Sequence, residues 1–183
     1  MSLDDILENC CAPFLMGLRP ACMFVAPWDC KGEIRETFYD TNVQIMPMGQ
    51  IGAGKELFFL YREEALKQEV NKTLQKEFLL QQGYLDFRVE ELIYRLSVRY
   101  QAYAKGKSTF PHEFGIFLGY SYEDVVGFIE HEGEDFLYAD YWKVYGNLEY
   151  KMDLFDRFHR AEKLFATMLH SGMDINSIIM QKG

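Results

Sequence analysis

The chain has 183 residues, of which 49% are hydrophobic and 26% are charged, and its formal net charge at pH 7 is −9. This composition is typical of a folded globular protein that buries a core, so we expect a single domain over residues 1–183. The acidic balance argues against a nucleic-acid partner, because binding to phosphates needs clustered Lys and Arg side chains.

The sequence also indicates where the protein is located. No run approaches the roughly 18 apolar residues of a membrane-spanning helix, and acids at Asp4 and Asp5 stand where a secretory signal would be basic. We therefore expect a cytoplasmic protein without a membrane partner, whose cysteines are thiols. Their spacing includes no C-x-x-C pair, so no structural zinc site is expected. The four cysteines are Cys10, Cys11, Cys22 and Cys30.

The first third of the chain predicts two helices, a strand and a hairpin. Ser2 can cap a short helix that should end before Pro13, and the apolar run between Pro20 and Pro27 is typical of a buried strand. Two further strand-like runs flank a glycine-rich turn, which indicates a β-hairpin. The expected elements are a helix over 3–9, a strand over 21–26, a helix over 32–41, and hairpin strands over 43–48 and 56–62.

The turn of this hairpin is similar in its letters to a phosphate-binding loop. Gly49–Glu56 reads GQIGAGKE, one residue away from G-x-x-x-x-G-K-[ST]. Glu56 replaces the hydroxyl residue that would hold Mg²⁺, and a strand follows where the motif requires the N-terminus of a helix. We interpret the segment as a turn and expect no nucleotide there.

The rest of the chain predicts mainly helices. Apolar residues recur at spacings of three and four, Pro111 suits a first helical turn, and Ser121 begins an S-x-x-D capping box. The expected elements are helices over 63–82, 86–104, 111–119, 121–133 and 147–170, a hinge loop over 104–108, and a strand over 134–145 that bends at 139–140. We therefore predict an α+β fold with a small mixed or antiparallel sheet. The early β-hairpin and a late strand form this sheet, and about six to eight helices pack on it.

Residues 110–146 combine aromatic side chains with negative charge. The segment holds 11 of the chain's 29 aromatic residues, and its eight acids against Lys143 alone give it −7 of the net charge. Such aromatics can line a ligand pocket, and Lys143 can anchor an anion. The same pattern is typical of sheet packing, of an acid beside a helix N-terminus, and of an ion pair between Lys143 and a neighbouring acid. The candidate site residues are His112, Glu113, Tyr120, Tyr141, Trp142, Lys143 and Tyr145.

Two hypotheses for function follow from this segment. The first is a binding or accessory module whose acidic, aromatic face around 110–146 contacts a protein or a small molecule. The alternative is a small hydrolytic or thiol-dependent enzyme that uses His112 and Glu113 with Cys11 or His131, which requires these side chains to converge in one pocket. A transition-metal site formed by His112, Glu113, His131 and a cysteine is a third reading. The sequence assigns no metal ligands, no cofactor and no oligomeric state.

Three segments carry a resemblance to a known family. They are NCCAPFLMGLRPACMF near the N-terminus, FPHEFGIFLGYSYEDVVGFIEHEG in the middle, and YWKVYGN after it. In order and separation they resemble the bacterial domain-of-unknown-function family number 3793 over essentially the whole chain. The resemblance implies a small intracellular protein of mainly anaerobic Gram-positive bacteria, and it supplies no catalytic residues. Members often have His before Cys-Ala-Pro, where this chain has Cys10, and this departure weakens a Cys–His nucleophile pair.

Overall fold

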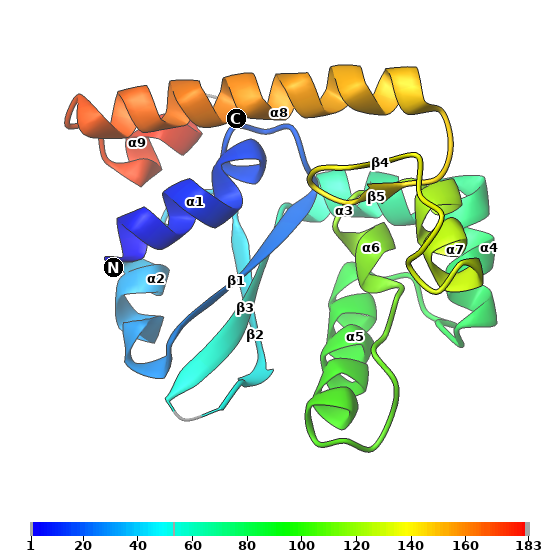
Figure 1. The fold of residues 1–183 in the computed structure, drawn as a ribbon. Coiled ribbons are helices and arrows are strands. Elements are labelled where there is room, and N and C mark those ends of the chain that lie inside the picture. Colours follow the sequence, from blue (N-terminus) through cyan, green and yellow to red (C-terminus); the bar gives the residue numbers. More distant parts are fainter. Residues whose placement is uncertain (1, 53, 182–183) are drawn as a thin grey trace.

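The structure is a computed structural model that describes residues 2–52 and 54–181, and over these it contains nine α-helices and two small antiparallel sheets (Figure 1). This arrangement confirms the predicted α+β class. In chain order the elements are α1 (Leu3–Leu15), β1 (Ala21–Pro27), the 3₁₀ helix η1 (Trp28–Cys30), α2 (Lys31–Thr37), β2 (Gln44–Gln50), β3 (Lys55–Tyr61), α3 (Glu63–Val70), α4 (Thr73–Gln81), α5 (Val89–Ala104), α6 (Phe114–Phe117), α7 (Tyr122–Glu130), β4 (Tyr138–Ala139), β5 (Lys143–Val144), α8 (Leu148–His170) and α9 (Ile175–Met180).

The main sheet has the strand order β1-β3-β2, and both neighbours of β3 are antiparallel to it. The hairpin β2–β3 confirms the predicted hairpin, although Ala53 of its turn lies outside the described residues. β1 lies on the other side of β3 in an unbroken register from Ala21↔Tyr61 to Pro27↔Lys55. β1 is therefore an edge strand of the sheet.

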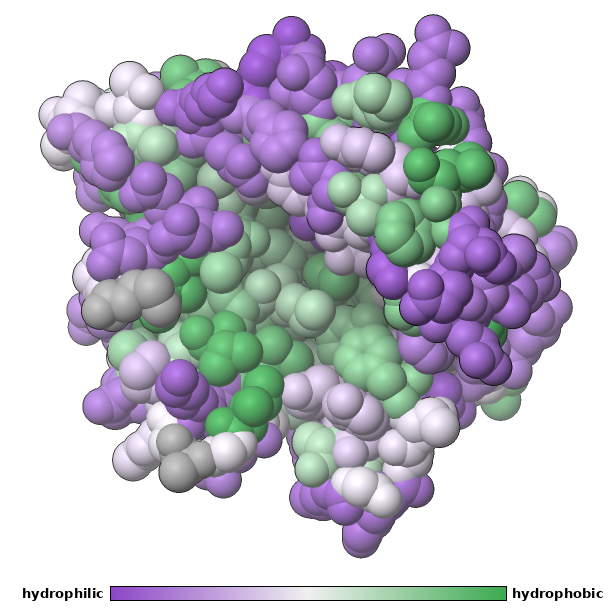
Figure 2. Space-filling view, viewed as in Figure 1, coloured by the Kyte–Doolittle hydropathy of each residue, from purple (hydrophilic) through white to green (hydrophobic). Residues whose placement is uncertain are grey.

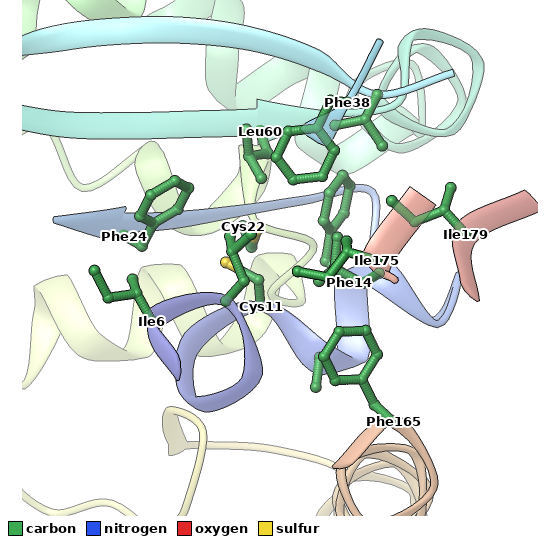
Figure 3. Packing of buried hydrophobic residues seen from close by; sticks show 14 of the residues in the cluster. Ile6, Cys11, Phe14, Cys22, Phe24, Phe38, Leu60, Phe165, Ile175 and Ile179 are labelled. Carbon is green, nitrogen blue, oxygen red and sulfur yellow. The ribbon is translucent and has the colours of Figure 1, made fainter. Parts of the chain in front are cut away.

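One face of the sheet is closed by helices α1, α2, α8 and α9. Phe24, Phe58 and Leu60 project from the strands into this first core, where they are almost completely buried. Figure 3 shows helix residues that meet them, including Phe14 of α1 and Phe165 of α8. The opposite face packs against α3, α4, α5 and α6 and forms a second core. The sheet therefore separates two apolar clusters, which explains why β3 reads as a continuous apolar run.

Several helix boundaries differ from the sequence expectation. The first helix does not end before Pro13 but continues to Leu15, because the residues around Pro13 are buried in the first core and packing outweighs the lost N–H donor. The helix expected over 63–82 is divided into α3 and α4 at Asn71, whose side chain donates to Lys67 O at 2.9 Å in the last turn of α3. Helix α9 was not predicted, and Asp174 caps it by accepting a hydrogen bond from Ser177 N.

The late strand expected over 134–145 does not join the main sheet. It folds back at Asp140 and forms a separate hairpin of two short strands, in which Tyr138 pairs with Val144. The helix expected over 111–119 has one α-helical turn, Phe114–Phe117, preceded by a turn at Pro111. Within the described residues, no helix combines the length and the apolar character needed to cross a membrane.

Candidate ligand-binding site

An apolar pocket of about 320 Å³ lies between β1, the α6–α7 pair and the β4–β5 hairpin. In Figure 2 it belongs to a hollow whose walls are coloured as hydrophobic, between the sheet and the helices that follow it. Its walls come from segments far apart in the sequence, so folding is required to form it. The lining residues are Met23, Phe110, His112, Phe114, Gly115, Leu118, Tyr120, Asp124, Val125, Phe128, Tyr141, Trp142 and Lys143.

Two glycines allow the segments around the pocket to pack closely. A Cβ at Gly115 would lie 2.6 Å from Val125 Cγ2, so only glycine lets α6 approach α7 this closely. A Cβ at Gly127 would lie 2.5 Å from Tyr145 Cβ, where the β4–β5 hairpin leads into α8. The two glycines thus allow side chains of neighbouring segments to pack directly on the backbone of α6 and α7.

The pocket wall contains two groups of aromatic rings. Tyr120 and Trp142 are stacked with their ring centroids 4.5 Å apart, and Phe155 of α8 meets Trp142 edge to face at 4.6 Å. On another part of the wall, the His112 ring lies 5.5 Å from Phe128. Such rings present flat apolar surfaces, which favour the binding of a planar or bulky apolar group.

A buried charged network supports this wall from behind. Asp124 is 1% exposed, and its carboxylate accepts hydrogen bonds from Trp142 Nε1 and Tyr145 N, both at 2.8 Å. Lys151 Nζ lies 2.7 Å from the same carboxylate and also donates to Ser121 Oγ at 2.8 Å. The Asp124–Lys151 pair therefore fixes the orientation of Trp142 in the pocket wall.

The pKa of Asp124 reflects this set of partners. Burial alone would raise the pKa, but the hydrogen bonds from Lys151 and from the other donors outweigh burial and hold the pKa below its ordinary value of 3.8. The charged form is therefore the one that the network stabilises. Because both charges are buried and their hydrogen bonds are made within the protein, the pair is suited to positioning Trp142.

The Asp124–Lys151 pair was not anticipated from the sequence. The S-x-x-D pattern predicted that Asp124 would complete a capping box, and Ser121 Oγ does accept from Asp124 N at 3.3 Å. The Asp124 side chain, however, bonds to Trp142, Tyr145 and Lys151 rather than to the backbone of Ser121. One signal was present in the sequence: Lys151 stands four residues before Phe155 on the apolar stripe of α8, where a charge needs a buried partner.

Two other predicted residues contribute to the pocket through the β4–β5 hairpin. Lys143 Nζ donates to Gly133 O at 2.5 Å and lies 4.7 Å from the centre of the Phe136 ring, so a backbone carbonyl takes the place of the expected acidic partner. Tyr141 donates its hydroxyl to Glu162 of α8 at 2.5 Å. Both contacts hold the hairpin in place beside the pocket.

Glu113 and Tyr145 are not among the residues that line the pocket. Glu113 is 1% exposed, forms an ion pair with Arg99 and accepts a hydrogen bond from Tyr84 Oη at 3.1 Å. Burial, and then the charge of Glu113, raise the pKa of Tyr84 above its ordinary value. Tyr145 stacks on His131 with ring centroids 5.5 Å apart. Of the seven candidate residues, the pocket brings together His112, Tyr120, Tyr141, Trp142 and Lys143.

Cys11 lies away from this pocket, in the first core. It is fully buried beside Cys22 (Figure 3), and burial followed by the contact with Cys22 raises the pKa of its thiol well above the ordinary value. His112 lines the pocket, whereas Cys11 is buried in the first core and is not among the lining residues. Within residues 2–52 and 54–181, no group of three or more His, Cys, Asp or Glu side chains is arranged to hold a metal ion.

Comparison with known proteins gives one match. No curated protein and no solved structure matches the chain. A family model described as "Protein of unknown function (DUF3793)" matches residues 7–179. This match covers the pocket, the buried pair that supports it, the second core, and the first core except Leu3 and Ile6. The chain therefore belongs to the DUF3793 family.

Proposed function

We propose that the protein is a binding module whose pocket accepts a neutral, apolar and preferably aromatic group. The observation that carries the proposal is the pocket of about 320 Å³, whose lining residues are mostly aromatic or aliphatic. Its stacked pair Tyr120–Trp142 is fixed by the Asp124–Lys151 network. A wall held in this way loses little conformational freedom on binding, which favours affinity.

The charge around the pocket defines the preferred ligand further. The segment that leads into the β4–β5 hairpin has exposed acids at Glu134 and Asp135, and Asp140 lies in the turn of the hairpin. The Lys143 ammonium already contacts a carbonyl oxygen. The negative charge of this segment disfavours an anionic ligand, whereas a neutral or cationic ligand would not be repelled. We therefore place a neutral apolar group in the pocket, with tolerance for a nearby positive charge.

The enzyme hypothesis receives less support from the same contacts. It needs an acid and a nucleophile near His112, but the Glu113 carboxylate is engaged with Arg99 and Tyr84. Cys11 is buried in the first core and does not line the pocket.

For the cellular location we propose the cytoplasm, because all four cysteines are free thiols, as is usual in a reducing compartment.

The binding of a neutral dye tests the proposal. The chain has two tryptophans, so Trp28→Phe leaves Trp142 as the single indole reporter in the pocket wall. We expect N-phenyl-1-naphthylamine to bind this variant saturably and to quench Trp142 by energy transfer. We expect 8-anilinonaphthalene-1-sulfonate, an anion with the same pair of ring systems, to bind more weakly.

A matched pair of variants locates the bound dye. Phe128→Ala removes a ring of the pocket wall, whereas Tyr39→Ala removes a ring that is 71% exposed and not part of the pocket. We expect Phe128→Ala to lower the affinity for the neutral dye about tenfold, equivalent to roughly 1.4 kcal/mol. We expect Tyr39→Ala to leave this affinity unchanged. No saturable binding, or equal binding by both variants, would refute the proposed function.

A further inference from the structure

The outer edge of β1 has unpaired backbone groups. At the two ends of the strand, Pro20 O and Trp28 N bond toward β3 at 3.0 and 3.1 Å. Because the β1–β3 register is unbroken, even-numbered residues direct their N–H and C=O groups toward β3, and odd-numbered residues direct theirs away. The outward groups belong to Ala21, Met23 and Val25, and no backbone hydrogen bond within the described residues uses them.

This edge is continuous with the pocket. The Met23 side chain lines the pocket, and Met23 and Val25 are 36% and 38% exposed on the same face of the sheet. In a β-ladder, residues directly opposite each other project their side chains to the same face. A strand added to β1 would therefore place the side chain opposite Met23 on the pocket side.

Over Ala21–Ala26, the edge lacks the features that usually block strand addition. β1 reads ACMFVAP and has no charged residue, and its register shows no bulge. Pro27 stands at its last position, beyond the exposed Val25. The segment between α7 and β4 carries two exposed acids, Glu134 and Asp135, which together with the chain's net charge of −9 complement a partner with basic residues.

We propose that β1 recruits an extended segment of a partner protein as a fourth strand of the sheet, with a bulky apolar side chain of that segment in the pocket and Lys or Arg beside it. The inference rests on the proposed function, since it uses the same pocket for the anchoring side chain. Main-chain hydrogen bonds to Met23 and Val25 supply the pairing, and the pocket supplies the specificity.

Substitutions at Val25 test the contribution of the β1 edge without changing the pocket lining. Val25→Pro removes an outward N–H without removing a bond to β3, and proline is tolerated at such edge positions. Val25→Thr keeps the N–H and the β-branched shape and is the matched control. Val25 does not line the pocket, so both variants should bind N-phenyl-1-naphthylamine like the parent chain, which also verifies that they are folded.

The probes are peptides selected on the immobilised full chain from a displayed library of random dodecamers and then synthesised. We expect them to have an apolar residue at alternate positions, an aromatic anchor and Lys or Arg. Val25→Pro should lower the affinity for these peptides about tenfold or more, as expected when main-chain hydrogen bonds are lost. Val25→Thr should leave the affinity unchanged. Methylating the peptide amides that face β1 should abolish binding, whereas methylating the alternate amides should not.

The possible outcomes distinguish this inference from the proposed function. If the dye binds but the selected peptides bind Val25→Pro as well as Val25→Thr, strand addition is wrong while the pocket stands. If no peptide is enriched and light scattering shows a dimer that Val25→Pro converts to monomer, the occupant is a second copy of this chain and the partner proposal is wrong. If the dye does not bind the parent chain, the proposed function is wrong, and the strand-addition proposal that rests on it is wrong as well.

Discussion

The two faces of the main sheet are both apolar, yet one is closed and the other is open beside β1. On the closed face, Phe24 of β1 is 3% exposed and stacks on Phe58 with ring centroids 5.5 Å apart. On the opposite face, its neighbour Met23 is 36% exposed and borders the pocket. Adjacent residues of one strand therefore serve different purposes, because successive side chains point to opposite faces.

The difference shows that apolar character in this chain does not by itself indicate core. Over β1 and β3, the closed face is covered by helices from both ends of the chain, which bury Phe24, Phe58 and Leu60. The open face is covered over β3 and β2 by α3, α5 and α6, but these helices do not extend over Met23 and Val25. The following predictions test this contrast, beginning with the largest expected effect.

The first prediction compares the two neighbours on β1. Phe24→Ala should lower the free energy of unfolding by about 3–5 kcal/mol, because it leaves a cavity in the first core. Met23→Ala should cost less than about 1 kcal/mol, because its side chain is partly solvated. Urea unfolding followed by circular dichroism measures both. Similar losses for the two variants would mean that the open face is buried in solution.

The second prediction concerns the charge pair behind the pocket. Lys151→Met should cost about 3 kcal/mol, because it leaves Asp124 buried without its cation. Lys163→Met, at an exposed position of the same helix, is the control and should change stability by less than about 0.5 kcal/mol. The measurement is chemical unfolding of both variants. A loss below 1 kcal/mol for Lys151→Met would show that the pair is not required, contrary to its assigned role.

The third prediction follows from the lowered pKa of Asp124. A carboxylate whose folded pKa is below the unfolded value of 3.8 stabilises the fold above pH 3.8, and this contribution is lost as the pH falls toward the folded pKa. Stability of the parent chain should therefore fall more steeply below pH 3.8 than that of Asp124→Asn. Unfolding curves across this acid range measure the difference. Parallel curves for the two proteins would contradict it.

The fourth prediction concerns the exposed contact between the hairpin and α8. Hydrogen bonding of His159 Nε2 to Asp140 at 2.9 Å raises the pKa of His159 above 6.5. Its contribution to stability is therefore present below pH 6.5 and is lost as the pH rises through the folded pKa. Asp140→Asn should lower the pKa of His159 in an NMR titration, because it removes the largest cause of the raised value, whereas Asp135→Asn should not. An unchanged pKa in Asp140→Asn would exclude this contact in solution.

Local signals accounted for much of the fold. The two strand-like runs and the glycine-rich turn between them predicted the β2–β3 hairpin, and the spacing of apolar residues predicted α5, α7 and α8. These elements depend on contacts between residues close in the chain, so their patterns are visible in the sequence. The concentration of aromatics in 110–146 likewise drew attention to five of the residues that line the pocket.

Features that depend on distant contacts could not be predicted in this way. Asp124 and Lys151 are 27 residues apart, and their pairing requires the hairpin to fold between them. Glu113 follows His112 directly, yet the turn before α6 directs it to Arg99 and Tyr84 rather than into the pocket. The partners of these side chains are set by tertiary packing between distant segments, which a local sequence pattern does not reveal.

Helix α8 has a consequence for how the protein unfolds. Its 23 residues extend about 35 Å at 1.5 Å per residue. Phe165 lies in the first core, while Phe155 and Lys151 lie behind Trp142. One continuous helix is thus shared by the closed core and the pocket wall, so the two regions should open as one cooperative unit. Ligand binding at Trp142 should accordingly slow amide exchange as far along the helix as Phe165, beyond the residues that touch the ligand.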